Sequence, residues 1–566
     1  AATATLGQYT LSHTCAAAIV RIEFTGLPTS YQPGPQGTNS GTSVQFVSAD
    51  AGNVDFGINV PNEYAQAAPN VVVPMHTNGD SQASPAGTAA TNTALWKAPF
   101  NGYATSGSSP NYALPSGPTT MVTGSKLGAT WGLAYHRTAK KLFVAAMERR
   151  HSGYGPLGPG GIYLVDATTN AVTNWLDINT LAGFDVGADV HSGLPSGGVT
   201  PSRDANSFDA VGKSAFGDID LSEDEQTLWA VDLKNRRLLE IPVGDLATAP
   251  TAAAITAHTI PDPTGGCNLG VLRPWGLAVH RGLVYVGAVC TGESSGAAQS
   301  DLKAVIYAHD PSGAVGNFTE FFSFSLAPSS ISKGCAVYPP TGSGSQCSGW
   351  RPWTNSWSSF SVVSAGLYTF VAYPQPILSD ILFDNDGSLI LGFSDRTGYQ
   401  TGYANYQPTG TSTTLYTGAT AGDLVRICNV NGTLALEGTD VACPRRSGTA
   451  STAESEYYNQ ESAPKFAAPA TDLHDEAAQG ALAMLPGSNN LVTTMTDPTD
   501  DQSGGLGWFN NSTGALASGA AASQSRVYRL FDGLSTGIGK AAGLGDLELL
   551  VDPAPLEIGN RVWNDA

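Results

Sequence analysis

Apolar and polar positions alternate over short stretches of this chain, and one two-strand pattern recurs. In residues 273–289, RPWGLAVHRGLVYVGAV, Leu277 and Val279 alternate with Ala278 and His280, and a second alternating run follows a glycine turn. Period-two alternation on both sides of such a turn predicts a β-hairpin. The same plan recurs at 130–147, 216–232, 378–393 and 479–495, with a shorter version at 544–552.

Six copies of one hairpin indicate a repeat architecture. A third strand ending in a polar turn follows several of them, at 160–175, 235–245, 303–315, 422–436 and 525–535. Strand, turn, strand, loop, strand is the order within a propeller blade. The sequence therefore predicts an all-β fold, with a β-propeller of six, or alternatively seven, blades over residues 93–553. We expect residues 93–100, TALWKAPF, to close the ring in the same sheet as 544–552.

Residues 1–61 predict a separate unit of four strands, GQYTL, AIVRIEFTGL, TSVQFVSA and NVDFGINV. Three of the matching segments are Gly7–Leu11, Val20–Phe24 and Val54–Gly57, and the fourth is Gly26-Leu27-Pro28. This unit resembles the second half of an SdrD B-like or Cna B-type module, an immunoglobulin-like stalk domain of bacterial surface proteins. The resemblance implies a partial immunoglobulin-like β-sandwich. Residues 62–92, rich in Pro, Ala, Asn and Thr, are interpreted as a linker.

The tail, residues 554–566, contains IGNRVWNDA, which resembles the first strand of the same kind of module. The chain as a whole thus resembles a bacterial extracellular β-propeller protein flanked by pieces of SdrD B-like modules. A lone strand at one end and an incomplete sheet at the other predict head-to-tail strand donation between copies. Its predicted interface residues are Leu556, Ile558, Val562 and Trp563. The alternative is that both ends are boundaries within a longer chain.

Composition narrows the function classes. Only 13% of residues are charged and the net charge is -20, which argues against nucleic acid as a partner. No apolar run is long enough for a membrane span. The acidity suits an extracellular, secreted or cell-surface protein that binds cations, or it serves solubility alone.

Seven cysteines occur and no C-x-x-C motif, so disulfides are expected rather than zinc. The local pairs are Cys267–Cys290, Cys335–Cys347 and Cys428–Cys443, with Cys15 left over.

Two constellations are candidates for binding. Asp218, Asp380 and Asp546 begin inner strands, and three such carboxylates at the channel mouth could hold calcium. Each could instead accept backbone N–H groups in its own turn. Trp350, Trp353 and Trp357 could form an exposed aromatic platform for a glycan, or could fix a long insertion onto the ring. Sequons at 317–319, 431–433 and 510–513 are interpreted as chance matches for a bacterial chain.

The expected function is structural: a subunit of an extracellular fibre or a cell-surface adhesin, whose partner is a second copy of itself. The alternatives are a calcium-dependent propeller hydrolase or oxidoreductase, and a glycan-binding surface module. No catalytic signature such as G-x-S-x-G or H-E-x-x-H is present. A deep open channel holding a metal would favour the enzyme, and a plugged channel would favour the fibre.

Overall fold

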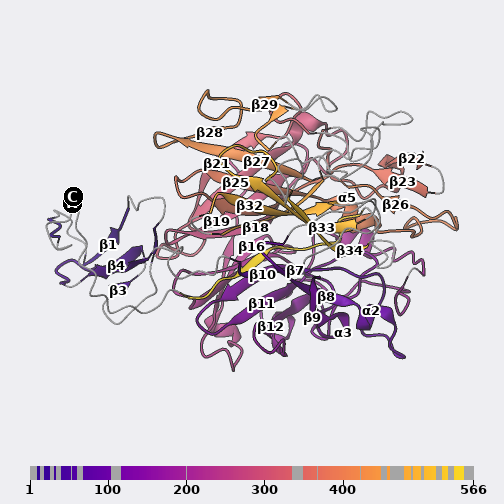
Figure 1. The fold of residues 1–566 in the computed structure, drawn as a ribbon, viewed down its shortest axis with the longest axis horizontal. Helices are drawn as coiled ribbons and strands as arrows, with labels where there is room; N and C mark the ends of the chain where they lie inside the picture. Colours follow the sequence, from indigo (N-terminus) through magenta and orange to yellow (C-terminus); the bar gives the residue numbers. More distant parts are fainter. Residues whose placement is uncertain are drawn as a thin grey trace.

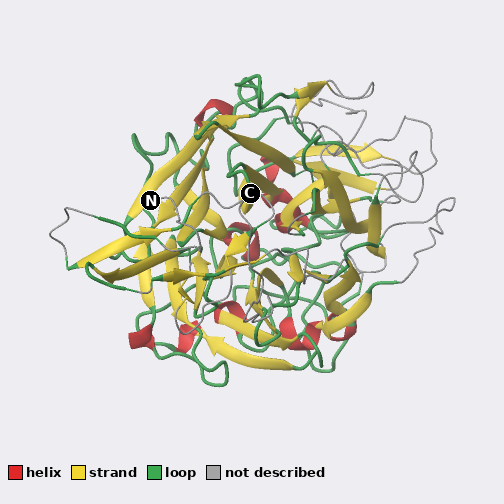
Figure 2. Ribbon diagram, turned by 60° about the vertical axis from the view of Figure 1, so that its left-hand side comes forward, coloured by secondary structure: helices red, strands yellow, loops and turns green. Residues whose placement is uncertain are grey.

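The computed structural model contains a ring of four-stranded antiparallel sheets (Figure 2) and a smaller N-terminal unit beside it, seen with β1 and β4 in Figure 1. It describes residues 9–12, 18–25, 31–33, 40–41, 43–52, 54–59, 68–102, 117–198, 200–333, 349–365, 368–420, 422–447, 455–458, 477–485, 488–498, 503–517, 526–532 and 541–553. Within these residues the ring has six such sheets.

Every sheet of the ring has an inner strand, an outer strand and two strands between them. From inner to outer, the first three sheets are β10 (Thr130–His136), β11 (Lys141–Ala146), β12 (Gly161–Asp166) and β13 (Val172–Asp177); β14 (Phe216–Leu221), β15 (Thr227–Asp232), β16 (Arg237–Pro242) and β17 (Thr256–Thr259); and β18 (Leu272–His280), β19 (Leu283–Cys290), β20 (Lys303–His309) and β21 (Phe318–Ser325). The others are β24 (Pro376–Phe383), β25 (Leu389–Asp395), β27 (Asp423–Val430) and β28 (Thr433–Leu436); β31 (Ala478–Met484), β32 (Asn490–Thr496), β33 (Ser503–Asn510) and β34 (Val527–Asp532); and β35 (Glu548–Leu550), β7 (Asn70–Pro74), β8 (Thr93–Pro99) and β9 (Thr119–Thr123).

The inner strands close a ring. They contact one another in the order β10, β14, β18, β24, β31 and β35, and β35 returns to β10. The fold is therefore a β-propeller, and the predicted fold class is confirmed. Residues 93–100 do lie in the sheet of β35, as predicted, but β7 stands between them. The linker prediction for 62–92 is therefore wrong at residues 70–74: Asn-Val-Val-Val-Pro is a strand buried on both faces, so it shows no alternation.

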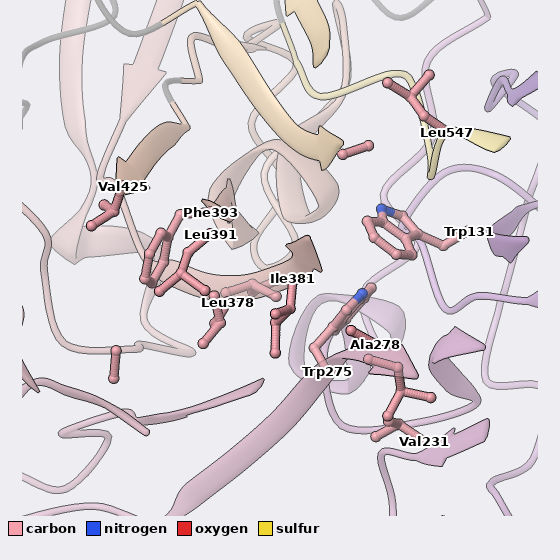
Figure 3. Packing of buried hydrophobic residues seen from close by; sticks show 14 of the residues in the cluster. Trp131, Val231, Trp275, Ala278, Leu378, Ile381, Leu391, Phe393, Val425 and Leu547 are labelled. Carbon is pink, nitrogen blue, oxygen red and sulfur yellow. The ribbon is translucent and has the colours of Figure 1, made fainter. Parts of the chain in front are cut away.

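Glycines let the inner strands approach closely. A Cβ atom on Gly132 would lie 2.9 Å from the backbone nitrogen of Ile219, and one on Gly276 would lie 2.9 Å from that of Asp380. The register of the inner hairpins shifts at these points, as at a β-bulge. Apolar side chains fill the space between the sheets, with Trp131, Trp275 and Ile381 among those drawn in Figure 3.

The N-terminal unit is built from short strands: β1 (Ile19–Glu23), β2 (Gln32–Pro33), β3 (Ser40–Gly41), β4 (Val44–Ser48), β5 (Asp55–Phe56) and β6 (Ile58–Asn59). β1 pairs with β4, β2 with β6, and β3 with β5. Strands thus form within three of the four predicted segments. The described residues of the first, from Tyr9 onward, form no strand, although the Tyr9 ring packs edge-on against Phe24. The immunoglobulin-like identity of this unit stays a prediction.

The N-terminal unit rests on the turns that follow the inner strands. The Ser43 hydroxyl donates to the Glu223 carboxylate at 2.9 Å, and the amide of Gly282 donates to the same carboxylate at 3.2 Å. Val44 packs against Gly282, where a Cβ atom would lie 2.7 Å from the Cβ of Val44. This contact fixes the position of the unit on one face of the ring.

Loops between the sheets carry short helices and one more sheet. The helices are α2 (Thr88–Thr91), α3 (Gly124–Leu127), α4 (Ser207–Ala210) and α5 (Arg396–Thr401), and the sheet contains β22 (Ser361–Ala365), β23 (Tyr368–Ala372) and β26 (Thr417–Gly418). β29 (Arg446–Ser447) and β30 (Ser455–Glu456) pair in an outer loop. No helix in the described part of the chain is long and apolar enough to cross a membrane.

Two of the predicted disulfides are present, Cys267–Cys290 and Cys428–Cys443. Cys335, Cys347 and Cys15 lie outside the described residues, as do the predicted interface residues Leu556, Ile558, Val562 and Trp563.

Candidate functional site: the two ends of the channel

The three predicted carboxylates are buried at alternate inner strands: Asp218 in β14, Asp380 within β24 and Asp546 just before β35. Each accepts two amide hydrogens: one from the next residue along the chain and one from the inner strand of the following sheet. The second partners are Leu277 for Asp218 at 2.9 Å, Leu482 for Asp380 at 2.6 Å, and Leu133 for Asp546 at 3.0 Å. Each carboxylate therefore joins two neighbouring sheets.

The electrostatics of these groups favour their neutral forms. Burial raises the pKa of Asp380 to about 7. Burial, followed by repulsion from the other carboxylates, raises the pKa of Asp218 and of Asp546 well above the usual range. Within the described residues, no group of three or more His, Cys, Asp or Glu side chains is arranged to hold a metal ion. Calcium binding by these three residues stays a prediction, and their amide hydrogen bonds occupy them without it.

The channel is filled at the end where the inner strands begin. Trp131 and Trp275 meet edge to face with ring centroids 5.7 Å apart. Tyr399 of α5 stacks on Trp275, and the indole nitrogen of Trp131 donates to the Tyr399 hydroxyl at 3.2 Å. All three side chains are buried, so α5 and two tryptophans form a plug.

Three buried arginines fasten the loops around this plug. Arg149 donates to the carbonyl of Ala542, Arg150 to that of Gln400, and Arg396 to that of Val211 at 2.9 Å. Burial lowers the pKa of Arg150 and of Arg396 to about 9, which still leaves both charged at neutral pH. The sequence did not predict this role, because a backbone carbonyl partner leaves no signature in the sequence.

A buried carboxylate–histidine network lies beside the arginines. His191 contacts Asp204 at 2.7 Å and Glu148 at 3.5 Å. Burial alone would lower the pKa of His191, but the two carboxylates raise it to about 9. Glu148 also accepts hydrogen bonds from Tyr154 and Ser207. The members hold one another across the loops, as expected for a structural network. The Nε2 atom of His191 has no hydrogen-bond partner within the described residues.

A cavity of about 320 Å³ opens at the other end, where the inner strands finish. Its lining includes carboxylates, two arginines, aromatic rings and one residue of the N-terminal unit: Asp220, Glu223, Glu225, Asp384, Glu548, Arg137, Arg281, Tyr135, Phe383 and Tyr31. Burial raises the pKa of Glu548 to about 8 and that of Asp220 to about 6. The sequence did not predict this cavity, because its residues come from several sheets and the N-terminal unit.

The predicted aromatic platform is wrong in two of its three residues. Trp350 and Trp353 are 0% and 3% exposed, because Trp350 packs on Phe393 and Trp353 donates to the carbonyl of Pro376. Trp357 is half-buried among Phe208, Phe360 and Tyr416. The alternative interpretation, in which these rings fix the insertion onto the ring, matches their contacts.

Comparison with known proteins gives distant relatives. No protein-family model matches the chain. Colossin-A of Dictyostelium discoideum is 27% identical over 456 residues, which cover 77% of this chain and 4% of Colossin-A. Colossin-B of the same organism is 24% identical over 588 residues, covering 99% of this chain and 13% of Colossin-B. The chain thus spans a small part of these curated relatives.

Solved structures show similarity at low sequence identity. The periplasmic gluconolactonase of Pseudomonas aeruginosa is 11% identical, with a TM-score of 0.31 over 85% of this chain and 99% of that one. The PQQ-bound aldose sugar dehydrogenase of Streptomyces coelicolor is 14% identical, with a TM-score of 0.28 over 72% of this chain and 83% of that one. Neither similarity bears on activity.

Proposed function

We propose that this chain is a structural subunit of an extracellular fibre or cell-surface adhesin. In this proposal the tail of one copy, residues 554–566, adds a strand to the N-terminal unit of the next copy. Head-to-tail contacts that do not close on themselves build an open filament.

The observation that carries the proposal is a sheet edge in the described part of the N-terminal unit. Among the described strands, β1 pairs only with β4, so its second edge has no described strand beside it. Ile19 on β1 is 64% exposed and Phe46 on β4 is 45% exposed. An open edge with apolar side chains is a template for another strand, and the backbone hydrogen bonds of an added strand would supply affinity.

The attachment of the N-terminal unit supports a mechanical role. Ser43 and Gly282 share the Glu223 carboxylate, and Val44 packs on Gly282. A donated strand would therefore be joined to a rigid ring. Two disulfides fit an oxidising compartment, which agrees with an extracellular location.

The plugged end of the channel favours this proposal over a propeller enzyme. Trp131, Trp275 and Tyr399 fill the end at which the three central carboxylates lie, and those carboxylates accept amide hydrogens. Substrate would have no path to them from that end.

The test is to delete residues 556–566 and to follow assembly by electron microscopy and sedimentation. We expect the full chain to form filaments and the truncated chain to stay monomeric. On the acceptor side, Ile19→Asp should block assembly, whereas Val441→Asp, at a residue that is 97% exposed elsewhere, should not. Filaments of the truncated chain, or a full chain that never assembles, would refute the proposal.

A further inference from the structure

Two glycosylation sequons lie in equivalent turns of adjacent sheets. Asn317 is the last residue of the turn between β20 and β21, and Phe318 and Thr319 begin β21. Asn431 and Gly432 form the turn between β27 and β28, and Thr433 begins β28. In both sheets this is the connection from the third strand to the fourth, and the two sheets are neighbours through β18 and β24. Both asparagines and both threonines are exposed.

The side-chain amides of these two asparagines are available. Asn317 uses its main chain in the turn, donating to Ala314 and accepting from the His309 ring at 3.0 Å. Asn431 has a φ of 53° and precedes Gly432 with a φ of 86°, so the pair forms the tip of a tight hairpin. Among the described residues, no hydrogen bond uses either side-chain amide.

Of the two remaining sequons, at Asn510 and Asn511, the second has the opposite environment. Asn511 is 3% exposed, and its amide nitrogen donates to Asp384 at 2.7 Å. Its carbonyl oxygen accepts from Arg426 at 2.6 Å and from Tyr458 at 2.7 Å. The side-chain carbonyl oxygen of Asn510 accepts the amide hydrogen of Thr513 at 3.0 Å and so stabilises the turn. A glycan on Asn511 would break the buried Arg426 network, and a chain carrying one could not fold as described.

We propose that, when this chain passes through a eukaryotic secretory pathway, Asn317 and Asn431 receive N-linked glycans and Asn510 and Asn511 do not. The donor class is a lipid-linked oligosaccharide pyrophosphate, supplied with its transferase by a eukaryotic secretory pathway. The asparagine amide nitrogen bonds to the anomeric carbon and loses a proton, while the bond from that carbon to the pyrophosphate oxygen breaks and the lipid pyrophosphate leaves. The inference rests on the proposed extracellular location and is independent of filament assembly.

The position of Asn317 gives the modification a place in the molecule. The turn that leads to it contributes Pro311 and Ser312 to a cavity of about 200 Å³, which Val44 and Phe46 of the N-terminal unit also line. A glycan at Asn317 therefore stands beside the junction of the two units. It would shield this rim of the ring from lateral contacts between copies.

The test uses the full chain secreted from a eukaryotic host. Amidase release of N-glycans in isotope-labelled water converts each occupied asparagine to a labelled aspartate, which peptide mass spectrometry locates. We expect labelled aspartate at positions 317 and 431. On a gel, partial release should lower the apparent mass of the parent chain in two steps, one for each glycan. The Asn317→Gln and Asn431→Gln variants should each show one step instead of two. Thr319→Ala and Thr433→Ala should remove the same steps while keeping each asparagine, and Thr433→Ser should retain its glycan.

Two outcomes would overturn the inference. One is a secreted, folded chain with neither Asn317 nor Asn431 labelled. The other is label at Asn510 or Asn511 in chain that unfolds at the same temperature as the unmodified protein. Because filaments are scored separately, glycosylated chains without filaments would count against the proposed function alone.

Discussion

At the scale of residues, the carboxylates of Asp218, Asp380 and Asp546 link neighbouring sheets by hydrogen bonds. They lie at every second inner strand and each binds an amide of the next sheet, so three side chains fasten three of the junctions around the ring. A buried amide that loses its acceptor costs about 1–3 kcal/mol.

Asp546→Ala should lower the free energy of unfolding by about 2 kcal/mol, since the amides of Leu133 and Leu547 both lose their acceptor. Urea unfolding followed by tryptophan fluorescence measures this change. Asp262→Ala is the control, because that carboxylate is 61% exposed and contacts Arg236 at the surface. Equal stability of the two variants would show that the hydrogen bonds to Asp546 contribute nothing to the free energy of unfolding.

Glu548 makes stability depend on pH. Its folded pKa is raised to about 8, above the usual 4.5, by burial. Between these values the unfolded chain releases the proton while the folded chain keeps it, so stability falls as pH rises and levels off above about 8. The Glu548→Gln variant should not show this fall in stability, because its side chain does not ionise. The melting temperature of the variant should equal that of the parent near pH 4.5 and exceed it increasingly toward pH 8; a constant difference would contradict the assignment.

At the scale of elements, ring closure combines both ends of the propeller in one sheet. β35 is the inner strand, and β7, β8 and β9 complete it, with Leu549 opposite Val71. Among the six described sheets of the ring, no other depends on strands so far apart in the chain.

Deleting residues 544–566 should therefore open the ring, because β7 loses its inner neighbour and the amide of Leu133 loses its hydrogen bond to Asp546. Deleting only 554–566 should leave the melting temperature of the propeller unchanged. Differential scanning calorimetry of the two truncations compares them directly. If both melt alike, β35 is not needed for closure.

The inner hairpins were predictable because their signal is local: alternation, a turn, and a glycine such as Gly132 or Gly276 at the close approach. β7 was missed because a short Val run beside Pro and Ala looks the same in a buried strand and in a linker. The hydrogen-bond partners of Asp218 and the burial of Trp353 could not be predicted from the sequence either. Both depend on contacts between segments that are far apart in sequence, and alternation within a segment carries no information about them.

At the scale of the whole molecule, the Glu223 carboxylate joins the N-terminal unit to the ring, because it accepts hydrogen bonds from Ser43 of the unit and from Gly282 of the ring. Glu223→Ala removes the acceptor of Ser43 and Gly282 and should loosen the unit from the ring. We expect a larger maximum dimension in X-ray scattering and faster proteolytic release of the N-terminal unit, with Asp262→Ala behaving as the parent. Unchanged scattering and proteolysis would mean that the packing of Val44 on Gly282 suffices.

The pairing of β35 with β7 has a mechanical consequence. Leu550 lies opposite Asn70, so the chain enters and leaves the propeller at the same end of one antiparallel pair. Tension applied along the polypeptide would pull these two strands apart like a zipper, breaking their hydrogen bonds one after another rather than all together. Once the contact of Ser43 and Val44 with the ring is broken, the closing sheet would be the first sheet of the ring to yield, and at low force. The other sheets would bear load only after the ring had opened.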